Sequence, residues 1–186
     1  MNLDALNALC AVPIFTEGRT HVDTLPLPFY KDVELIRAQS FSTIPPVTLE
    51  FLSTPTGLLK LDGTREPVYE ASRRGTLLIN EQTLVPYLTF IMGAVQTEEG
   101  SLRVVEHFTD ELFTGAPTAA ARKTLQRLIR PAQLTRTGDK WAVDAIVLYG
   151  AAVYQTQLEV LPDGEVNIID EQLLADNLPI RPIFLE

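Results

Sequence analysis

Cysteine and histidine are scarce in this chain of 186 residues, which has one cysteine, Cys10, and two histidines, His21 and His107. A single thiol can form neither an intramolecular disulfide nor, without companions, a zinc cluster, so nothing marks an oxidising compartment. The three residues are widely separated and lack the compact spacings of a zinc site. We therefore expect no metal site and no cofactor, although scattered carboxylates could hold a hard cation.

Long apolar runs are missing too. No segment approaches the roughly 20 apolar residues of a membrane span, so we expect no membrane partner. The first twelve residues carry Asp4 and no lysine or arginine before their apolar part, unlike a secretory signal. Together with the single cysteine, these absences favour a cytoplasmic location.

Positive charge is in short supply, because 15 lysines and arginines stand against 24 aspartates and glutamates, for a net charge of -9. An acidic protein of this kind repels phosphate backbones and anionic lipids, which argues against a nucleic-acid partner. Glycine-rich phosphate loops and the nucleophile elbow of serine hydrolases are also absent. The sequence therefore leaves the enzyme question open and favours a noncatalytic protein.

What the chain does contain is an ordinary globular composition, with 46% hydrophobic and 21% charged residues. Its length fits one domain, and we expect residues 1–186 to form a single domain. The clearest pattern lies near the end, where polar and mainly apolar residues alternate from Val153 to Leu161. Asp163 and Gly164 then favour a tight turn, which predicts an antiparallel hairpin with Val166–Ile169.

Two helices are predicted in the middle of the chain. The first begins near Asn80 or Thr83 and buries Leu84, Leu88 and Ile91, and the second runs from about Thr118 to Arg130. Earlier, Leu3, Leu6, Leu9 and Cys10 fit a short amphipathic helix. The prolines between residues 13 and 74 indicate an irregular half with one small hairpin at residues 47–61, followed by a surface loop over residues 64–74.

These elements predict a single α+β domain with one curved antiparallel sheet, dominated by the C-terminal strands and covered on one face by the two helices. The segment from Leu84 to Glu106, the hairpin that begins at Trp141 and the closing Leu178-Pro-Ile resemble uncharacterised bacterial proteins. Helices followed by a long antiparallel meander are also similar to cystatin-like and NTF2-like α+β rolls. Neither resemblance implies an activity.

Four polar residues are candidates for ligand binding: His107, Asp144, Tyr149 and Tyr154. His107 stands near two carboxylates in an arrangement that acid–base chemistry would use, although an ordinary strand-end histidine explains it more simply. The two tyrosines and Asp144 belong to the C-terminal strands, where packing of the rings is the simpler explanation.

Arg122, Arg127 and Arg130 concentrate positive charge on the second helix of an otherwise acidic chain. They are candidates for binding an acidic protein or a second copy of this one, although a solvated helix face would look the same. The leading interpretation is a noncatalytic binding or protein-interaction domain. The alternative is a small enzyme or small-molecule binder with a pocket between sheet and helices.

Overall fold

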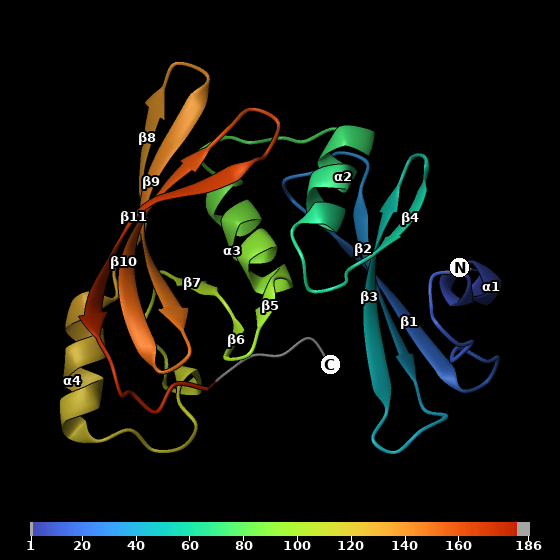
Figure 1. The fold of residues 1–186 in the computed structure, drawn as a ribbon, viewed down its shortest axis with the longest axis horizontal. Coiled ribbons are helices and arrows are strands. Elements are labelled where there is room, and N and C mark those ends of the chain that lie inside the picture. Colours follow the sequence, from blue (N-terminus) through green and yellow to red (C-terminus); the bar gives the residue numbers. More distant parts are fainter. Residues whose placement is uncertain (1, 182–186) are drawn as a thin grey trace. The chain divides into compact units, whose positions relative to one another are not determined.

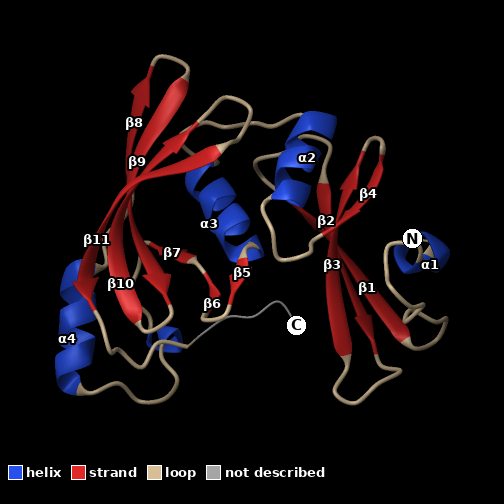
Figure 2. Cartoon of the chain, viewed as in Figure 1, coloured by secondary structure: helices blue, strands red, loops and turns tan. Residues whose placement is uncertain are grey.

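The computed structural model describes residues 2–181 and divides them into two compact units, one ending at Leu78 and the other beginning at Ile79. Both units combine helices with antiparallel sheets (Figure 1, Figure 2), which confirms the α+β class. The expectation of one domain over residues 1–186 stays a prediction, because compact units in one chain can still unfold together.

The first unit is built around a four-stranded antiparallel sheet in the order β1-β2-β3-β4. One face of this sheet carries Ile36, Ala38 and Phe51, which pack with Leu6 and Phe15 into a buried cluster. The bounds of the elements are α1 (Leu3–Asn7), β1 (Thr20–Pro26), β2 (Glu34–Ser40), β3 (Val47–Thr54), β4 (Gly57–Lys60) and α2 (Glu66–Arg74).

The expectation of an irregular half was wrong, because three of these strands have seven or eight residues. The prolines lie at the ends of strands and in the connections between them. Pro26 ends β1, Pro45 and Pro46 lie in the β2–β3 loop, and Pro55 lies in the β3–β4 turn. Proline thus sets the lengths of the strands here without interrupting them. The predicted hairpin of residues 47–61 is confirmed as β3–β4.

The surface loop expected over residues 64–74 is instead the helix α2. Pro67 stands in its first turn, where a missing N–H costs nothing, and Val68 and Ala71 are buried. Its exposed side is held by Glu70, which accepts hydrogen bonds from Arg73 at 2.8 Å and Arg74 at 2.7 Å. The buried residues span only about one helical turn, so the sequence analysis did not recognise a helical pattern here.

Tyr30, in the connection between β1 and β2, contacts α2 within the first unit. Its ring is buried, and its hydroxyl lies 2.7 Å from the Ser72 Oγ atom and donates to the Val68 carbonyl at 3.2 Å. Burial raises the pKa of Tyr30 to about 12, an effect that its hydrogen bond with Ser72 only partly offsets.

The second unit holds a five-stranded antiparallel sheet in which β11, β10, β9 and β7 follow one another and β8 also pairs with β9. β5 and β6 form a separate two-stranded ribbon. The bounds are α3 (Leu84–Ala94), β5 (Gln96–Thr97), β6 (Gly100–Ser101), β7 (Arg103–Val105), the 3₁₀-helix η1 (Asp110–Leu112), α4 (Ala119–Leu128), β8 (Gln133–Thr137), β9 (Lys140–Tyr149), β10 (Ala152–Val160) and β11 (Val166–Ala175).

The predicted C-terminal hairpin is confirmed, because β10 and β11 pair antiparallel around a turn in which Gly164 has a φ angle of 91°. That angle lies in the left-handed region, which suits glycine. The hydroxyl of buried Tyr87, on α3, donates to the Gly164 carbonyl and so ties the helix to the turn. The hairpin thereby sets where α3 meets the sheet.

Both predicted helices are confirmed, α3 after the N-cap residue Thr83 and α4 after the N-cap residue Thr118. Asn80 accepts hydrogen bonds from the backbone N–H groups of Gln82 and Thr83 ahead of α3, and Thr118 caps α4 by accepting from Ala121. No helix among residues 2–181 is long and apolar enough to cross a membrane.

Both faces of β9 are buried. Ile146 and Leu148 on one face pack with Leu125 and Ile129 from α4 and its C-terminal end. Val143, Ala145 and Val147 on the other face are also buried, and Figure 1 shows α3 and α4 on opposite sides of this sheet. The prediction that both helices cover one face is therefore not confirmed. The described strands also lie in three sheets, where a single curved one was expected.

The burial of α3 makes a stability prediction. Leu88 is fully buried, so we expect Leu88→Ala to lower the free energy of unfolding by about 2–5 kcal/mol through lost contacts and a residual cavity. Leu78→Ala is the matched control, because that side chain is 42% exposed and should lose less than about 1 kcal/mol. Urea denaturation measures both, and equal losses would contradict the burial of α3.

The raised pKa of Tyr30 makes a prediction about alkaline pH. Because the folded-state pKa of about 12 exceeds the ordinary value of 10.0, the folded state holds this proton more tightly than the unfolded state. The resulting stability is complete below pH 10 and is lost as the pH rises towards 12. Tyr30→Phe should flatten this decline, and denaturant melts at pH 8, 10 and 11.5 measure it; an equally steep decline in the variant would contradict the assignment to Tyr30.

Candidate functional site

The four candidate ligand-binding residues do not come together. Strand pairing places Tyr154 opposite Val147, and Tyr149 lies two residues further along β9, so both tyrosines belong to the same face of the sheet. Asp144 lies three residues before Val147 and belongs to the opposite face. His107 follows the end of β7 and is exposed. The sheet itself thus separates Asp144 from the tyrosines.

Asp144 instead belongs to a small polar network beside α4. Its carboxylate accepts a hydrogen bond from Arg130 at 3.0 Å and another from Gln155 at 2.7 Å. Arg130 follows α4 and Gln155 lies on β10, so the network joins the end of the helix to the sheet. The Nη1 atom of Arg130 is buried without a hydrogen-bond partner among the described residues, so Asp144 is the one anion that compensates this guanidinium there.

The basic helix is largely engaged within the protein. Arg122 pairs with Asp110 at 2.8 Å, and its guanidinium lies over the Phe108 ring at 5.9 Å from the centroid. Arg130 is held by Asp144. Of the three arginines predicted to bind a partner, Arg127 alone is exposed and makes no hydrogen bond or ion pair within residues 2–181. Two of the three charges are therefore partly neutralised before any partner arrives.

A row of charges that the sequence analysis missed crosses the first unit's sheet. Asp23, Arg37 and Glu50 are register neighbours on β1, β2 and β3. Arg37 pairs with Glu50 at 2.8 Å, while the His21 ring nitrogen lies 3.0 Å from Asp23. His21 is 64% exposed, and no nucleophile accompanies it in this row. These are ion pairs on the surface of the sheet, which contribute little to the free energy of unfolding and form no catalytic site.

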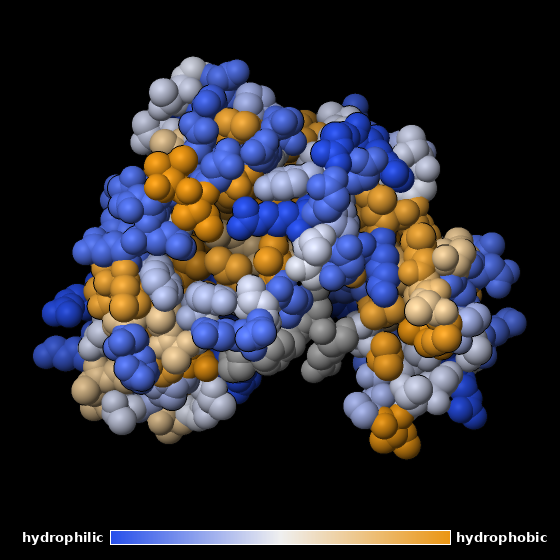
Figure 3. All heavy atoms as spheres, viewed as in Figure 1, coloured by the Kyte–Doolittle hydropathy of each residue, from blue (hydrophilic) through white to orange (hydrophobic). Residues whose placement is uncertain are grey.

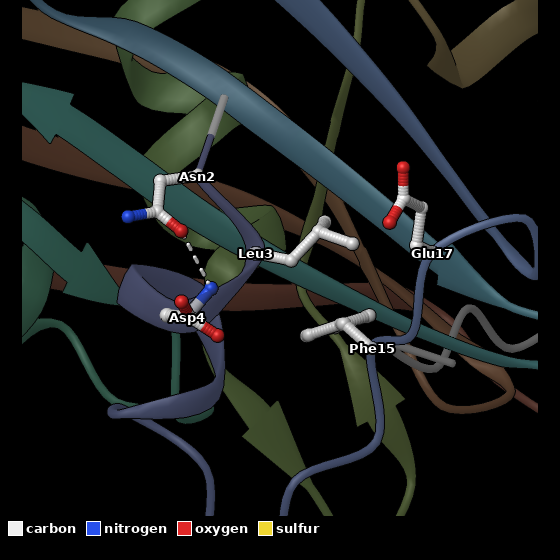
Figure 4. A pocket seen from close by; sticks show the side chains of 5 residues that line it. All are labelled: Asn2, Leu3, Asp4, Phe15 and Glu17. Atoms are coloured by element: carbon white, nitrogen blue, oxygen red, sulfur yellow. Dashed lines mark hydrogen bonds between the residues drawn. The ribbon is translucent and has the colours of Figure 1, made fainter.

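A hollow beside α1 is lined by Asn2, Leu3, Asp4, Phe15 and Glu17 (Figure 4). The Asn2 side chain accepts a hydrogen bond from the Asp4 backbone N–H at 2.9 Å, which caps the helix. The one hydrogen bond drawn in Figure 4 is therefore explained by the capping of α1. No group of three or more His, Cys, Asp or Glu residues within the described chain could hold a metal ion.

The apolar side chains of β11 are exposed. Ile168, Ile169 and Leu173 are 38%, 62% and 50% exposed, and Figure 3 shows apolar surface along this strand. β11 forms one edge of the five-stranded sheet, and no other described strand pairs with its outer side. An edge strand has unpaired N–H and C=O groups, which makes it a template for another strand. In the second unit, the exposed large apolar side chains of the described residues are these three, and all lie beside this edge.

The exposed edge was missed because the sequence analysis ended this strand at Ile169. The next residues, Asp170 and Glu171, look like a polar break, yet the strand continues to Ala175. Two register shifts flank the acidic pair, one at Ile169 and one at Leu174. Between them Asp170–Leu173 run in regular pairing with Gln157–Tyr154. The structure leaves six consecutive residues, 168–173, exposed, whereas the sequence offered only an aliphatic pair followed by an acidic pair.

Comparisons with known proteins find no matching family, curated protein or solved structure for this chain. The similarity to uncharacterised bacterial proteins and to cystatin-like or NTF2-like rolls therefore stays a prediction.

The Asp144 network makes a prediction that separates it from the surface pairs. Asp144→Ala leaves a partly buried guanidinium without its anion and should lower the free energy of unfolding by about 1–3 kcal/mol. Asp110→Ala is the control, because its pair with Arg122 is more exposed and should be worth less than about 1 kcal/mol. Denaturant melts of both variants measure this difference. A smaller loss for Asp144→Ala than for Asp110→Ala would contradict the structural role of the network.

Proposed function

We propose that this protein is a noncatalytic interaction protein that binds a protein partner through β11. The observation that carries the proposal is the exposure of Ile168, Ile169 and Leu173 beside the free edge of the sheet. Exposed apolar groups that flank unpaired backbone are the two elements of recognition by strand addition, in which main-chain hydrogen bonds supply affinity and side chains supply specificity. The partner is a protein because only a polypeptide offers the matching row of N–H and C=O groups.

Two alternatives from the sequence are less well supported. A small enzyme or small-molecule binder would use a pocket containing His107, Asp144, Tyr149 and Tyr154, but Asp144 lies on the face of the sheet opposite to both tyrosines. Docking through the basic helix would use Arg122, Arg127 and Arg130, but two of them are paired within the protein. The cytoplasmic location and the bacterial origin stay predictions from the sequence.

Site-specific photo-crosslinking tests the proposal. A benzophenone amino acid at position 169, introduced in the cells that make the protein, should give a discrete adduct with another polypeptide. The same group at Lys123, which is exposed on α4, is the control for nonspecific capture and should give none. Adding Leu173→Lys should remove the adduct at position 169, because the charge disrupts the apolar strip.

Two outcomes would overturn the proposal. An adduct at position 123 with none at 169 would make α4 the binding surface. Adducts at position 169 that survive Leu173→Lys would mean that the apolar strip does not direct binding.

A further inference from the structure

We infer that β11 accepts a short extended segment whose centre is two cationic residues flanked on both sides by aliphatic ones. The inference rests on the proposed function and adds the chemistry of the partner. Its basis is the order of side chains along the edge: Ile168 and Ile169, then the acidic pair Asp170 and Glu171, then the uncharged Gln172 and the aliphatic Leu173. An added strand would meet these residues one by one.

The two carboxylates point to opposite faces of the sheet. Asp170 is the register partner of Gln157, and Glu171 is the partner of Thr156, the next residue of β10. Successive residues of a strand alternate between faces, so each face of the edge presents one negative charge. Directly opposite side chains in neighbouring strands have Cβ atoms about 5 Å apart, close enough for an ion pair. Two consecutive lysines or arginines in the added strand would therefore meet one carboxylate each.

The same charges oppose pairing with a second copy. If two β11 strands paired antiparallel about a two-fold axis between residues 170 and 171, Asp170 of one copy would face Glu171 of the other. Like charges directly opposite each other destabilise a strand pair. The register shifts at Ile169 and Leu174 also limit the regular edge to the four residues Asp170–Leu173. The edge thus disfavours self-association and suits one short foreign segment of opposite charge.

The protein's own field acts in the same direction. A net charge of -9 attracts a cationic segment from a distance, and Asp170 and Glu171 then fix its register. Neither carboxylate has a hydrogen bond or ion pair with a basic side chain of the described chain. The two carboxylates can therefore pair with a partner's cations, whereas Asp144 and Asp110 are already paired with arginines of the protein.

The test uses the full chain and a labelled eight-residue peptide in which two central lysines are flanked on each side by two valines and an end threonine. Fluorescence anisotropy should detect binding that weakens about tenfold or more with Asp170→Lys/Glu171→Lys. The control is Glu111→Lys/Asp139→Lys, which changes the net charge equally at two exposed positions of the same unit and should leave binding nearly unchanged. A peptide N-methylated at alternate residues should also bind at least about tenfold more weakly, because it cannot complete the backbone ladder.

Four outcomes would contradict the inference. Equal binding of a peptide with two glutamates in place of the lysines would overturn the charge specificity. Equal weakening by both charge-reversed variants would reduce the binding to long-range attraction. If the peptide does not bind but the crosslink at position 169 persists, the inference of a cationic segment is wrong and the proposed function still holds. Concentration-dependent self-association of the wild type that Leu173→Lys abolishes would make a second copy the occupant.

Discussion

The second unit depends on one constraint, the two-residue period of β9. Because β9 pairs with β10 on one side and with β7 and β8 on the other, neither of its edges is open. Its residues alternate between two buried faces, one built on Ile146 and Leu148 and the other on Val143, Ala145 and Val147. A shift of one residue would exchange the two faces, so the packing of α4 and the placement of Asp144 both depend on this register. The large apolar side chains that stay exposed in this unit, Ile168, Ile169 and Leu173, lie on the edge strand β11.

The polar residues of this unit follow from the same register. Asp144 lies on the face that α4 covers, and Arg130 meets it there at the end of the helix. Pairing compensates a charge that would otherwise be left partly desolvated, which is why both residues are better explained by structure than by ligand binding. Once these pairs are formed, charge remains available on β11, where Asp170 and Glu171 lie between exposed aliphatic residues. The exposed aliphatic residues and the two carboxylates of β11 are the observations that support the proposed binding of another chain.

The sequence predicted those elements in which the hydrophobic pattern is sustained and in which a cap or turn residue marks the end. The helix that begins at Leu84 and the hairpin around Gly164 were predicted because several turns or residues repeat the pattern and a cap or turn closes it. The helix α2 was not predicted, since its buried side consists of only Pro67, Val68 and Ala71. The strands β1 and β2 were also missed, because the prolines of their connections looked like breaks. The two-sided burial of β9 was readable from the continuous run Ala145-Ile-Val-Leu148, which is typical of a strand covered on both faces.

The candidate site was harder to predict, because it depends on contacts between distant parts of the chain. Nothing local indicates that Arg130 meets Asp144 or that Asp144 and Tyr154 lie on opposite faces; strand register decides both. An edge strand is likewise defined by a neighbour that is absent, and a sequence does not show which strand will be outermost. The local signal was an isoleucine pair followed by two acidic residues, and the predicted strand ended at Ile169.

Hydrogen exchange of the individual β11 amides, measured by NMR with and without the two-lysine peptide, tests the central claim most directly. In the free protein, amides of Asp170–Leu173 that donate to β10 should be protected, while those that point outward should exchange rapidly. Saturation with the peptide should slow the outward amides at least about tenfold and leave the amides of β8 unchanged. Outward amides that are already protected in the free protein, or protection that the peptide induces elsewhere, would contradict a free edge that recognises a cationic strand.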